Sequence, residues 1–278
     1  MKPAPFAYAR PADLAAATTL LAQGDGAAMA ISGGQSLLVL MSLRLTAIET
    51  LVDLSRLPDL KRVEETATEV FLGAATTHAM VEDGRVPDPS RGLMAQVAAK
   101  IAYRAVRNLG TLGGSVALAD PSADWPACLM ALNAQAVIVG PDGARREAVE
   151  AFVRGPYETS LAAGEVIAGF AIPRLGPGAR WGVAKVARKS GAFADSLAIV
   201  VEPGEGAPAR VALAGTSSHA QLLPHVAAYL GGAPEIDPAA LRAAVRADLT
   251  QVDPDADPYR LRCHGATVLK AVMEARAS

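Results

Sequence analysis

Two glycine pairs constrain this chain more than any other feature, because hydroxyl residues flank both of them. The first glycine segment, Ser32-Gly33-Gly34-Gln35-Ser36, directly follows a strand-like apolar run at residues 27–31, and the second glycine segment covers residues 110–115. Glycine-rich turns let several backbone N–H groups converge on a phosphate without Cβ atoms in the way. The serine and threonine side chains can add further donors.

A purely structural explanation of the same segments stands beside this one. Glycine pairs occur in ordinary tight turns. Neither segment fits G-x-x-x-x-G-K-[ST] or G-x-G-x-x-G, the standard nucleotide-binding motifs. Two segments far apart in sequence suit a diphosphate held between two lobes. The residue pattern alone therefore leaves both dinucleotide binding and simple turns open.

The rest of the chain alternates between strand-like and helical patterns, punctuated by turn residues. In the first 175 residues we expect strands at 6–8, 27–31, 51–54, 69–73, 136–139 and 165–172, and helices after Asp13, after Thr76 or Thr77, at 93–101 and at 126–132. A turn at 57–60 is a plausible lobe boundary, and residues 176–178 are the best linker candidate. Beyond the linker we expect strands at 181–188, 196–202 and 209–214, then helices at 222–230, 239–249 and 259–275. Strands followed by helices indicate a small α+β domain.

Composition excludes several classes of protein. The hydrophobic fraction is 51% and the formal net charge is -2, so no excess of positive charge favours binding to nucleic acid. Aromatic residues make up 4%, which leaves few side chains on which bases could stack. No stretch is apolar enough for a membrane span, and the N-terminus lacks the pattern of a signal peptide, so we expect a cytoplasmic protein. Two cysteines, Cys128 and Cys263, are too few for an iron–sulfur cluster in this chain alone.

Two longer motifs carry a resemblance. The run A-I-S-G-G-Q-S-L-L at 30–38, followed by M-S-L-R at 41–44, resembles the first signature of the flavoprotein (medium) subunits of the carbon monoxide dehydrogenase and xanthine dehydrogenase family. The run V-R-N-L-G-T-L-G-G-S at 106–115, continuing through A-D-P-S-A-D at 119–124, resembles the second. The similarity extends through 73–78 and 184–191 and keeps the family's order over essentially the whole chain.

The resemblance implies a fold and a cofactor. It indicates an α+β protein with a two-lobed FAD-binding domain of the vanillyl-alcohol-oxidase type at residues 1–175, its lobes covering about 1–57 and 58–175. A small C-terminal domain of a sheet plus helices follows at 176–278. The first glycine segment lacks the cysteine or histidine that tethers flavin in some relatives of this fold. We therefore expect FAD to bind non-covalently.

The resemblance also implies site residues. Both glycine segments are expected to wrap the FAD pyrophosphate, Asp124 to bind a ribose hydroxyl on the adenosine side, and Lys185, with Lys189 as an alternative, to lie near the flavin. From the residues alone, Asp124 has a second interpretation as a helix N-cap, and His78 has a second interpretation as a polar residue at the start of a helix. The cofactor-binding candidates are Ser32, Gly33, Gly34, Gln35, Ser36, Leu37, Thr77, His78, Thr111, Gly113, Gly114, Ser115, Asp124 and Lys185.

Other polar residues carry weaker signals. The histidines have no metal-ligand spacing, and we expect His219, His225 and His264 at the surface. Arg104 and Arg107 can pair with a phosphate, with a partner subunit or with surface carboxylates. No Ser–His–Asp or Cys–His set is visible, so no catalytic side chain and no metal site are assigned.

The family resemblance implies an oxidoreductase subunit that acts only within a complex. FAD on this chain would take electrons from 2Fe–2S clusters of a small partner subunit and pass them to an external acceptor. A large partner subunit would carry the molybdenum–pterin cofactor, and the whole would form a dimer of heterotrimers. Two alternatives stand beside this prediction: a stand-alone FAD-dependent oxidoreductase of the same fold, and a flavin-free structural subunit.

Overall fold

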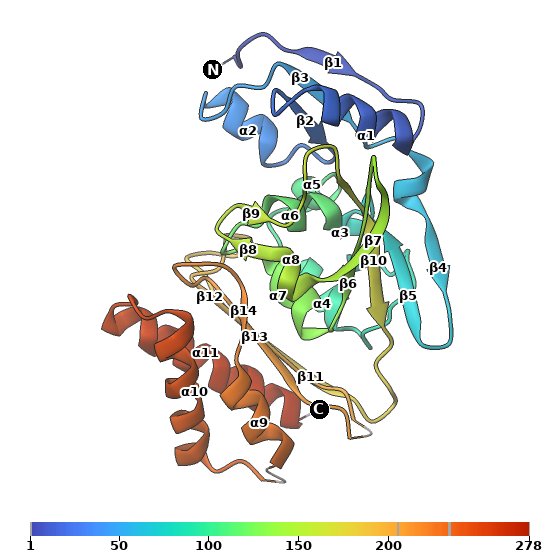
Figure 1. Cartoon of the computed structure of the whole chain (residues 1–278). Coiled ribbons are helices and arrows are strands. Elements are labelled where there is room, and N and C mark those ends of the chain that lie inside the picture. The colour runs from blue at the N-terminus through green and yellow to red at the C-terminus, as the bar shows by residue number, and fades with distance from the viewer. Residues whose placement is uncertain (1, 205, 233–234, 278) are drawn as a thin grey trace.

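The structure, a computed structural model, describes residues 2–204, 206–232 and 235–277 (Figure 1). Figure 1 shows three parts in succession: a small N-terminal sheet with its helices in blue, a larger middle sheet beside green helices, and a C-terminal sheet covered by orange and red helices. Among the helices of these ranges, none is both long and apolar enough to cross a membrane.

The N-terminal part is a three-stranded parallel sheet in the order β1-β3-β2. Its elements are β1 (Ala7–Ala9), α1 (Leu14–Gln23), β2 (Ala28–Ile31), α2 (Leu37–Ser42) and β3 (Thr50–Asp53). The Asp13 carboxylate accepts a hydrogen bond from the Ala16 N–H at 2.8 Å and so caps α1 as predicted. The three predicted strands are confirmed. Helix α2 has no predicted counterpart, because six residues without a polar face give no helical period.

The middle part is an antiparallel five-stranded sheet in the order β4-β5-β10-β6-β7. Its strands are β4 (Val63–Glu65), β5 (Glu69–Gly73), β6 (Gln135–Gly140), β7 (Gly143–Ala148) and β10 (Val166–Pro173). The segments between them contribute η1 (Pro58–Lys61), α3 (His78–Glu82), α4 (Leu93–Ala99), α5 (Arg104–Arg107), α6 (Leu112–Leu118), α7 (Asp124–Ala131), α8 (Val149–Phe152), β8 (Val153–Gly155) and β9 (Glu158–Thr159). The expected turn at 57–60 is the start of the 3-10 helix η1.

The C-terminal part follows the predicted order of strands and then helices. An antiparallel sheet in the order β11-β12-β13-β14 comes first. Its elements are β11 (Arg180–Val186), β12 (Ser196–Glu202), β13 (Arg210–Ala214), β14 (Gln221–Leu222), α9 (Pro224–Gly232), α10 (Pro238–Val252) and α11 (Pro258–Ala277). The predicted strands and helices beyond the linker are confirmed.

Both faces of the C-terminal sheet are buried, and they belong to different cores. Alternate residues of a strand point to opposite faces. Leu197, Ile199 and Val201 of β12 join the core of the middle part. Helix α7 of that part packs against β12. Ala198 and Val200 join a second core with α9, α10 and α11. The sheet therefore ties the C-terminal helices to the middle part, which carries the second glycine segment.

Candidate cofactor-binding site

The two glycine segments lie in contact, although they belong to different parts of the chain. The Thr111 hydroxyl donates to the Ser32 hydroxyl at 3.3 Å. A Cβ atom at Gly33 would lie 2.1 Å from the carbonyl oxygen of Leu109, a distance that no real side chain adopts. Glycine at position 33 therefore allows the backbones of the two segments to touch.

The first glycine segment presents unpaired backbone donors. No described residue accepts a hydrogen bond from the N–H groups of Gly33, Gly34, Gln35 or Ser36. Gly34 has a φ of +68°, a left-handed conformation that favours glycine. The Gln35 side chain donates to the Gly33 carbonyl at 2.9 Å and stabilises this turn. Four successive free N–H groups form a site suited to an anion.

The second glycine segment is not a turn, and the prediction of a turn at 110–115 is wrong. Thr111 is the N-cap of α6, and its hydroxyl oxygen accepts a hydrogen bond from the Gly114 N–H at 3.0 Å. The next backbone donors are also used within the protein: Leu112 donates to Thr76, and Gly113 donates to Ala74. Capping by Thr111 outweighs the low helix propensity of the glycine pair.

The two glycines of α6 have different surroundings. A Cβ atom at Gly113 would lie 2.5 Å from the Cβ of Ala74, so close packing requires glycine there. A Cβ atom at Gly114 would meet only the Thr111 hydroxyl, at 3.0 Å, and otherwise open space. Gly114 therefore faces outward, beside the hydroxyl of Thr111.

Thr77 and His78 adjoin the second glycine segment. The Thr77 hydroxyl oxygen caps α3 by accepting a hydrogen bond from the Met80 N–H at 3.2 Å, and Thr77 bridges to Thr111. His78 is 5% exposed, and its backbone N–H donates to the Gly110 carbonyl at 2.9 Å. Burial, with a smaller effect of the Arg107 guanidinium, lowers the pKa of His78 from 6.5 to about 4. The imidazole is therefore neutral at neutral pH.

Asp124 and Lys185 bind each other. The Lys185 ammonium of β11 donates to both carboxylate oxygens of Asp124, at 2.8 and 3.0 Å, and to the Lys100 carbonyl at 3.3 Å. The side chain of Lys185 is only 7% exposed and that of Asp124 only 6%. Burial raises the pKa of the Asp124 carboxyl, and the lysine opposes that shift. The N-cap of α7 is Ala123, so the capping explanation of Asp124 is wrong; Lys189 is exposed.

Arg104 and Arg107 are occupied by carboxylates of this chain. Arg107 donates to both oxygens of Glu82, at 2.8 and 2.9 Å, and also to the carbonyls of Ile101 and Ala102. Arg104 binds Asp83 and Glu82. These bonds fasten α5, which directly precedes the second glycine segment, to α3. Of the three partners expected for the two arginines, the structure shows carboxylates of the same chain.

Comparison with known proteins decides the family. Residues 4–175 match the family described as the FAD binding domain in molybdopterin dehydrogenase. The chain belongs to this family. It is 36% identical over 251 residues to the nicotine 6-hydroxylase medium subunit of Paenarthrobacter nicotinovorans, covering 89% of this chain and 87% of that protein. It is 32% identical over 290 residues to the carbon monoxide dehydrogenase medium chain of Afipia carboxidovorans, covering 100% and 99%.

Solved structures agree with this assignment. Carbon monoxide dehydrogenase from Hydrogenophaga pseudoflava superposes with a TM-score of 0.92 at 31% identity, over 100% of this chain and 99% of that one. The mixed fold of helices and sheets is thus that of a carbon monoxide dehydrogenase medium subunit. The chain is an FAD-binding medium subunit of the molybdenum hydroxylase family and part of an oxidoreductase.

The residues of this medium subunit fit FAD. The diphosphate of FAD is an anion that needs several donors, and four free N–H groups stand in the first glycine segment. The Ser32 hydroxyl of that segment accepts from the Thr111 hydroxyl, which caps α6, and Gly114 of α6 leaves open space on its outward side. Within the described ranges, no group of three or more His, Cys, Asp or Glu side chains could hold a metal ion.

One buried polar cluster of the medium subunit escaped prediction. The His264 ring nitrogens lie 2.8 Å from the Ser196 hydroxyl and 3.3 Å from the Asp253 carboxylate. Because all three side chains are at most 1% exposed, this Ser–His–Asp set joins β12 to the C-terminal helices rather than meeting a substrate. The prediction that His264 lies at the surface is wrong. The signal was present, since His264, Val268 and Val272 share one buried face of α11.

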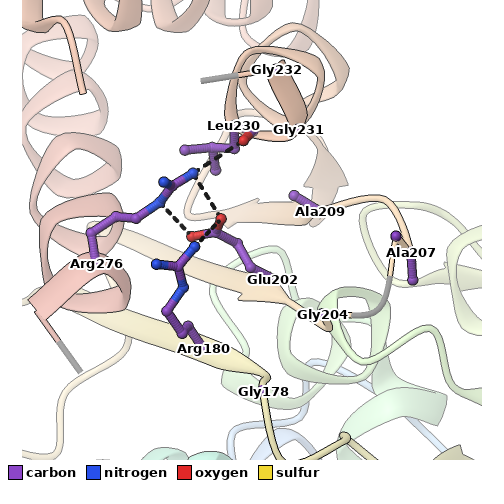
Figure 2. Close-up of a pocket in the computed structure, with 11 residues that line it drawn as sticks. Gly178, Arg180, Glu202, Gly204, Ala207, Ala209, Leu230, Gly231, Gly232 and Arg276 are labelled. Atoms are coloured by element: carbon purple, nitrogen blue, oxygen red, sulfur yellow. Dashed lines mark hydrogen bonds and ion pairs between the residues drawn. The ribbon is translucent and has the colours of Figure 1, made fainter. Parts of the chain in front are cut away.

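A cavity of about 420 Å³ opens where the ends of β11, β12, α9 and α11 meet, on the C-terminal part (Figure 2). Figure 2 shows Arg180 and Arg276 directed at the Glu202 carboxylate, to which they donate at 3.2 and 2.8 Å. The carboxylate offsets part of the guanidinium charge. The lining includes none of the predicted site residues, so this cavity is separate from the glycine segments.

Proposed function

We propose that the chain binds FAD non-covalently where the two glycine segments meet, and that it passes electrons from 2Fe–2S clusters of a partner chain to an external acceptor. The row of four free backbone N–H groups, next to the contact between Ser32 and Thr111, carries this proposal. FAD supplies the redox chemistry, and the protein supplies binding and orientation. The side chains named above then need to position the cofactor rather than act as acids or bases.

The proposed roles follow the contacts. Residues 32–37 donate to the diphosphate from the first segment, and Thr111, Gly114 and Ser115 contact it from the second. Gly113 allows α6 to pack at the correct depth. Thr77 and His78 lie beside the cofactor. Asp124 and Lys185, as an ion pair, adjoin the adenosine and flavin portions.

The proposed complex contains a large subunit with the molybdenum–pterin cofactor and a small subunit with 2Fe–2S clusters, arranged as a dimer of heterotrimers. Two relatives whose names describe them as medium chains or subunits support such an assembly. We also propose residues 1–175 as a two-lobed FAD-binding domain of the vanillyl-alcohol-oxidase type, and 176–278 as the C-terminal domain. The cytoplasmic location stays a prediction.

Acid treatment of the purified protein is expected to release one FAD per chain. The first glycine segment holds no cysteine or histidine that could form a bond to the flavin. The measurement is the flavin absorbance of the supernatant and of the pellet after acid precipitation. Flavin that stays with the precipitated polypeptide would contradict non-covalent binding, and a protein without flavin that takes up none from solution would contradict the proposed function.

The FAD-loaded chain alone is expected to accept electrons from dithionite but to oxidise no heterocycle, aldehyde or carbon monoxide. Its two cysteines cannot supply the four thiolates of a cluster. Adding the iron–sulfur and molybdenum chains should produce a stable complex in which substrate reduces the flavin. Oxidation of an organic substrate by the lone chain at an enzymatic rate would instead support a stand-alone flavin enzyme.

A further inference from the structure

The buried histidine beside the second glycine segment has one occupied nitrogen and one free nitrogen. The Trp125 indole N–H donates to His78 Nδ1 at 2.9 Å, and the two ring centroids lie 5.9 Å apart. Trp125 is fully buried in the first turn of α7. An indole N–H is a donor only. Nδ1 must therefore be the acceptor, and the proton of the neutral ring is on Nε2.

The second nitrogen lies where the glycine segments touch. A Cβ atom at Gly110 would be 2.7 Å from His78 Nε2, and a Cβ atom at Gly33 would be 2.9 Å from the α-carbon of Gly110. No described residue accepts a hydrogen bond from Nε2. Among the described residues, Thr76 Oγ1 is the one fully buried side-chain polar atom without a hydrogen-bond partner. Because Nε2 also has no partner and is not such an atom, it keeps some contact with solvent.

We propose that His78 donates a hydrogen bond from Nε2–H to an oxygen of the FAD diphosphate, and that Trp125 is the positioning residue that keeps the proton on that nitrogen. The inference rests on the proposed function, because it needs FAD at the junction of the two segments. It adds to the backbone donors of the first glycine segment a side-chain donor from α3.

The arrangement explains why a histidine in this position is useful although it is neutral. Burial lowers the pKa of His78, so the ring carries no charge at neutral pH. A neutral imidazole has one donor and one acceptor, and which nitrogen donates depends on its other partner. With Trp125 bound to Nδ1, the Nε2–H group faces the junction in every molecule. The ring therefore does not have to change tautomer when FAD binds.

Two substitutions at position 78 separate the two nitrogens. In His78→Asn the short amide places its oxygen near the Nδ1 position, so it can still accept from Trp125 but cannot reach the junction. In His78→Gln the longer amide can donate at the Nε2 position but leaves the Trp125 indole without an acceptor. The two variants therefore keep opposite halves of the arrangement.

The test measures FAD affinity by fluorescence titration of the flavin-free full-length chain, together with its melting temperature. We expect His78→Asn to raise the dissociation constant of FAD by about 10- to 100-fold, the effect of losing one hydrogen bond to a charged oxygen, with a melting temperature close to wild type. We expect His78→Gln to bind FAD within about threefold of wild type but to melt at a lower temperature.

A spectroscopic measurement tests the role of Trp125. In Trp125→Phe the ring volume is largely kept and the donor is lost, so nitrogen chemical shifts of His78 should change from a pure Nε2–H form to a mixture of both tautomers. FAD binding by His78→Asn as tight as wild type would overturn the inference while leaving the proposed function intact. So would a loss of affinity in both variants that parallels their melting temperatures. A wild-type chain that binds no FAD would instead reject the proposed function.

Discussion

Replacing Lys185 with methionine is expected to lower the free energy of unfolding of the flavin-free chain by about 3–5 kcal/mol. The substitution keeps most of the side-chain length but removes the charge that pairs with Asp124. Both side chains are more than nine-tenths buried, so water cannot replace the lost partner. The Asp124 carboxylate would then stay buried and unpaired or take up a proton. Urea denaturation followed by circular dichroism measures the loss.

Two control variants test whether the loss of stability comes from an unpaired buried charge. Arg85→Met removes a pair with Asp83 whose arginine is 56% exposed, and it should cost less than about 1 kcal/mol. Combining Lys185→Met with Asp124→Asn removes both charges and should restore most of the stability, since a neutral pair has no uncompensated charge. If Lys185→Met destabilised the chain no more than Arg85→Met, the pair would not be a buried interaction. FAD affinity of the same variants tests the proposed cofactor contacts separately.

Gly114→Val is expected to raise the dissociation constant of FAD by about 100-fold or more while the fold is kept. The branched side chain would extend into the open space outside α6 and displace the diphosphate that we propose to bind there. Losing about two hydrogen bonds to charged oxygens, at ~1.5–3 kcal/mol each, corresponds to at least this factor. Valine has a higher helix propensity than glycine, so α6 should persist. Flavin titration and the melting temperature are the two measurements.

The neighbouring glycine supplies the matched control. A Cβ atom at Gly113 would press on Ala74, so Gly113→Ala should cost about 1–3 kcal/mol of stability as overpacking does. Gly33→Val is a poor control, because its Cβ would collide with the Leu109 backbone and force the two segments apart. A Gly114→Val variant with normal flavin content would remove the support for a diphosphate at this junction.

Much of the fold was predictable because its signals are local. Short apolar runs bounded by turn residues predict the strands, and Asp13 and a threonine at 76 or 77 stand before apolar patterns as helix caps, of which the structure has Asp13 and Thr77. The misses have local causes as well. Helix α6 contains a glycine pair in its first turn, which suggests a turn until the capping hydroxyl of Thr111 is considered. A capping threonine three residues before Gly114 was the available signal.

The contacts among the candidate site residues were only partly predictable from the sequence. The glycine segments were predicted to share a ligand, and they lie in contact. That Asp124 binds Lys185, or that Trp125 binds His78, depends on how distant elements pack, and no local pattern encodes such a pair. For His264, the face of α11 that it shares with Val268 and Val272 is a local signal of burial, but its contacts with Ser196 and Asp253 depend on the same long-range packing.

The ion pair between α7 and β11 has a consequence for how the protein is made. Lys185 follows Asp124 by 61 residues, so at ~5–20 residues per second a ribosome needs roughly 3–12 s to synthesise the lysine after the aspartate. All residues of both glycine segments have been synthesised before that interval begins. Until Lys185 of β11 is present, the Asp124 carboxylate has no charged partner, so burying it together with α7 is costly. The order of synthesis therefore delays burial of the Asp124 carboxylate, one of the proposed cofactor contacts, until the C-terminal sheet has begun to form.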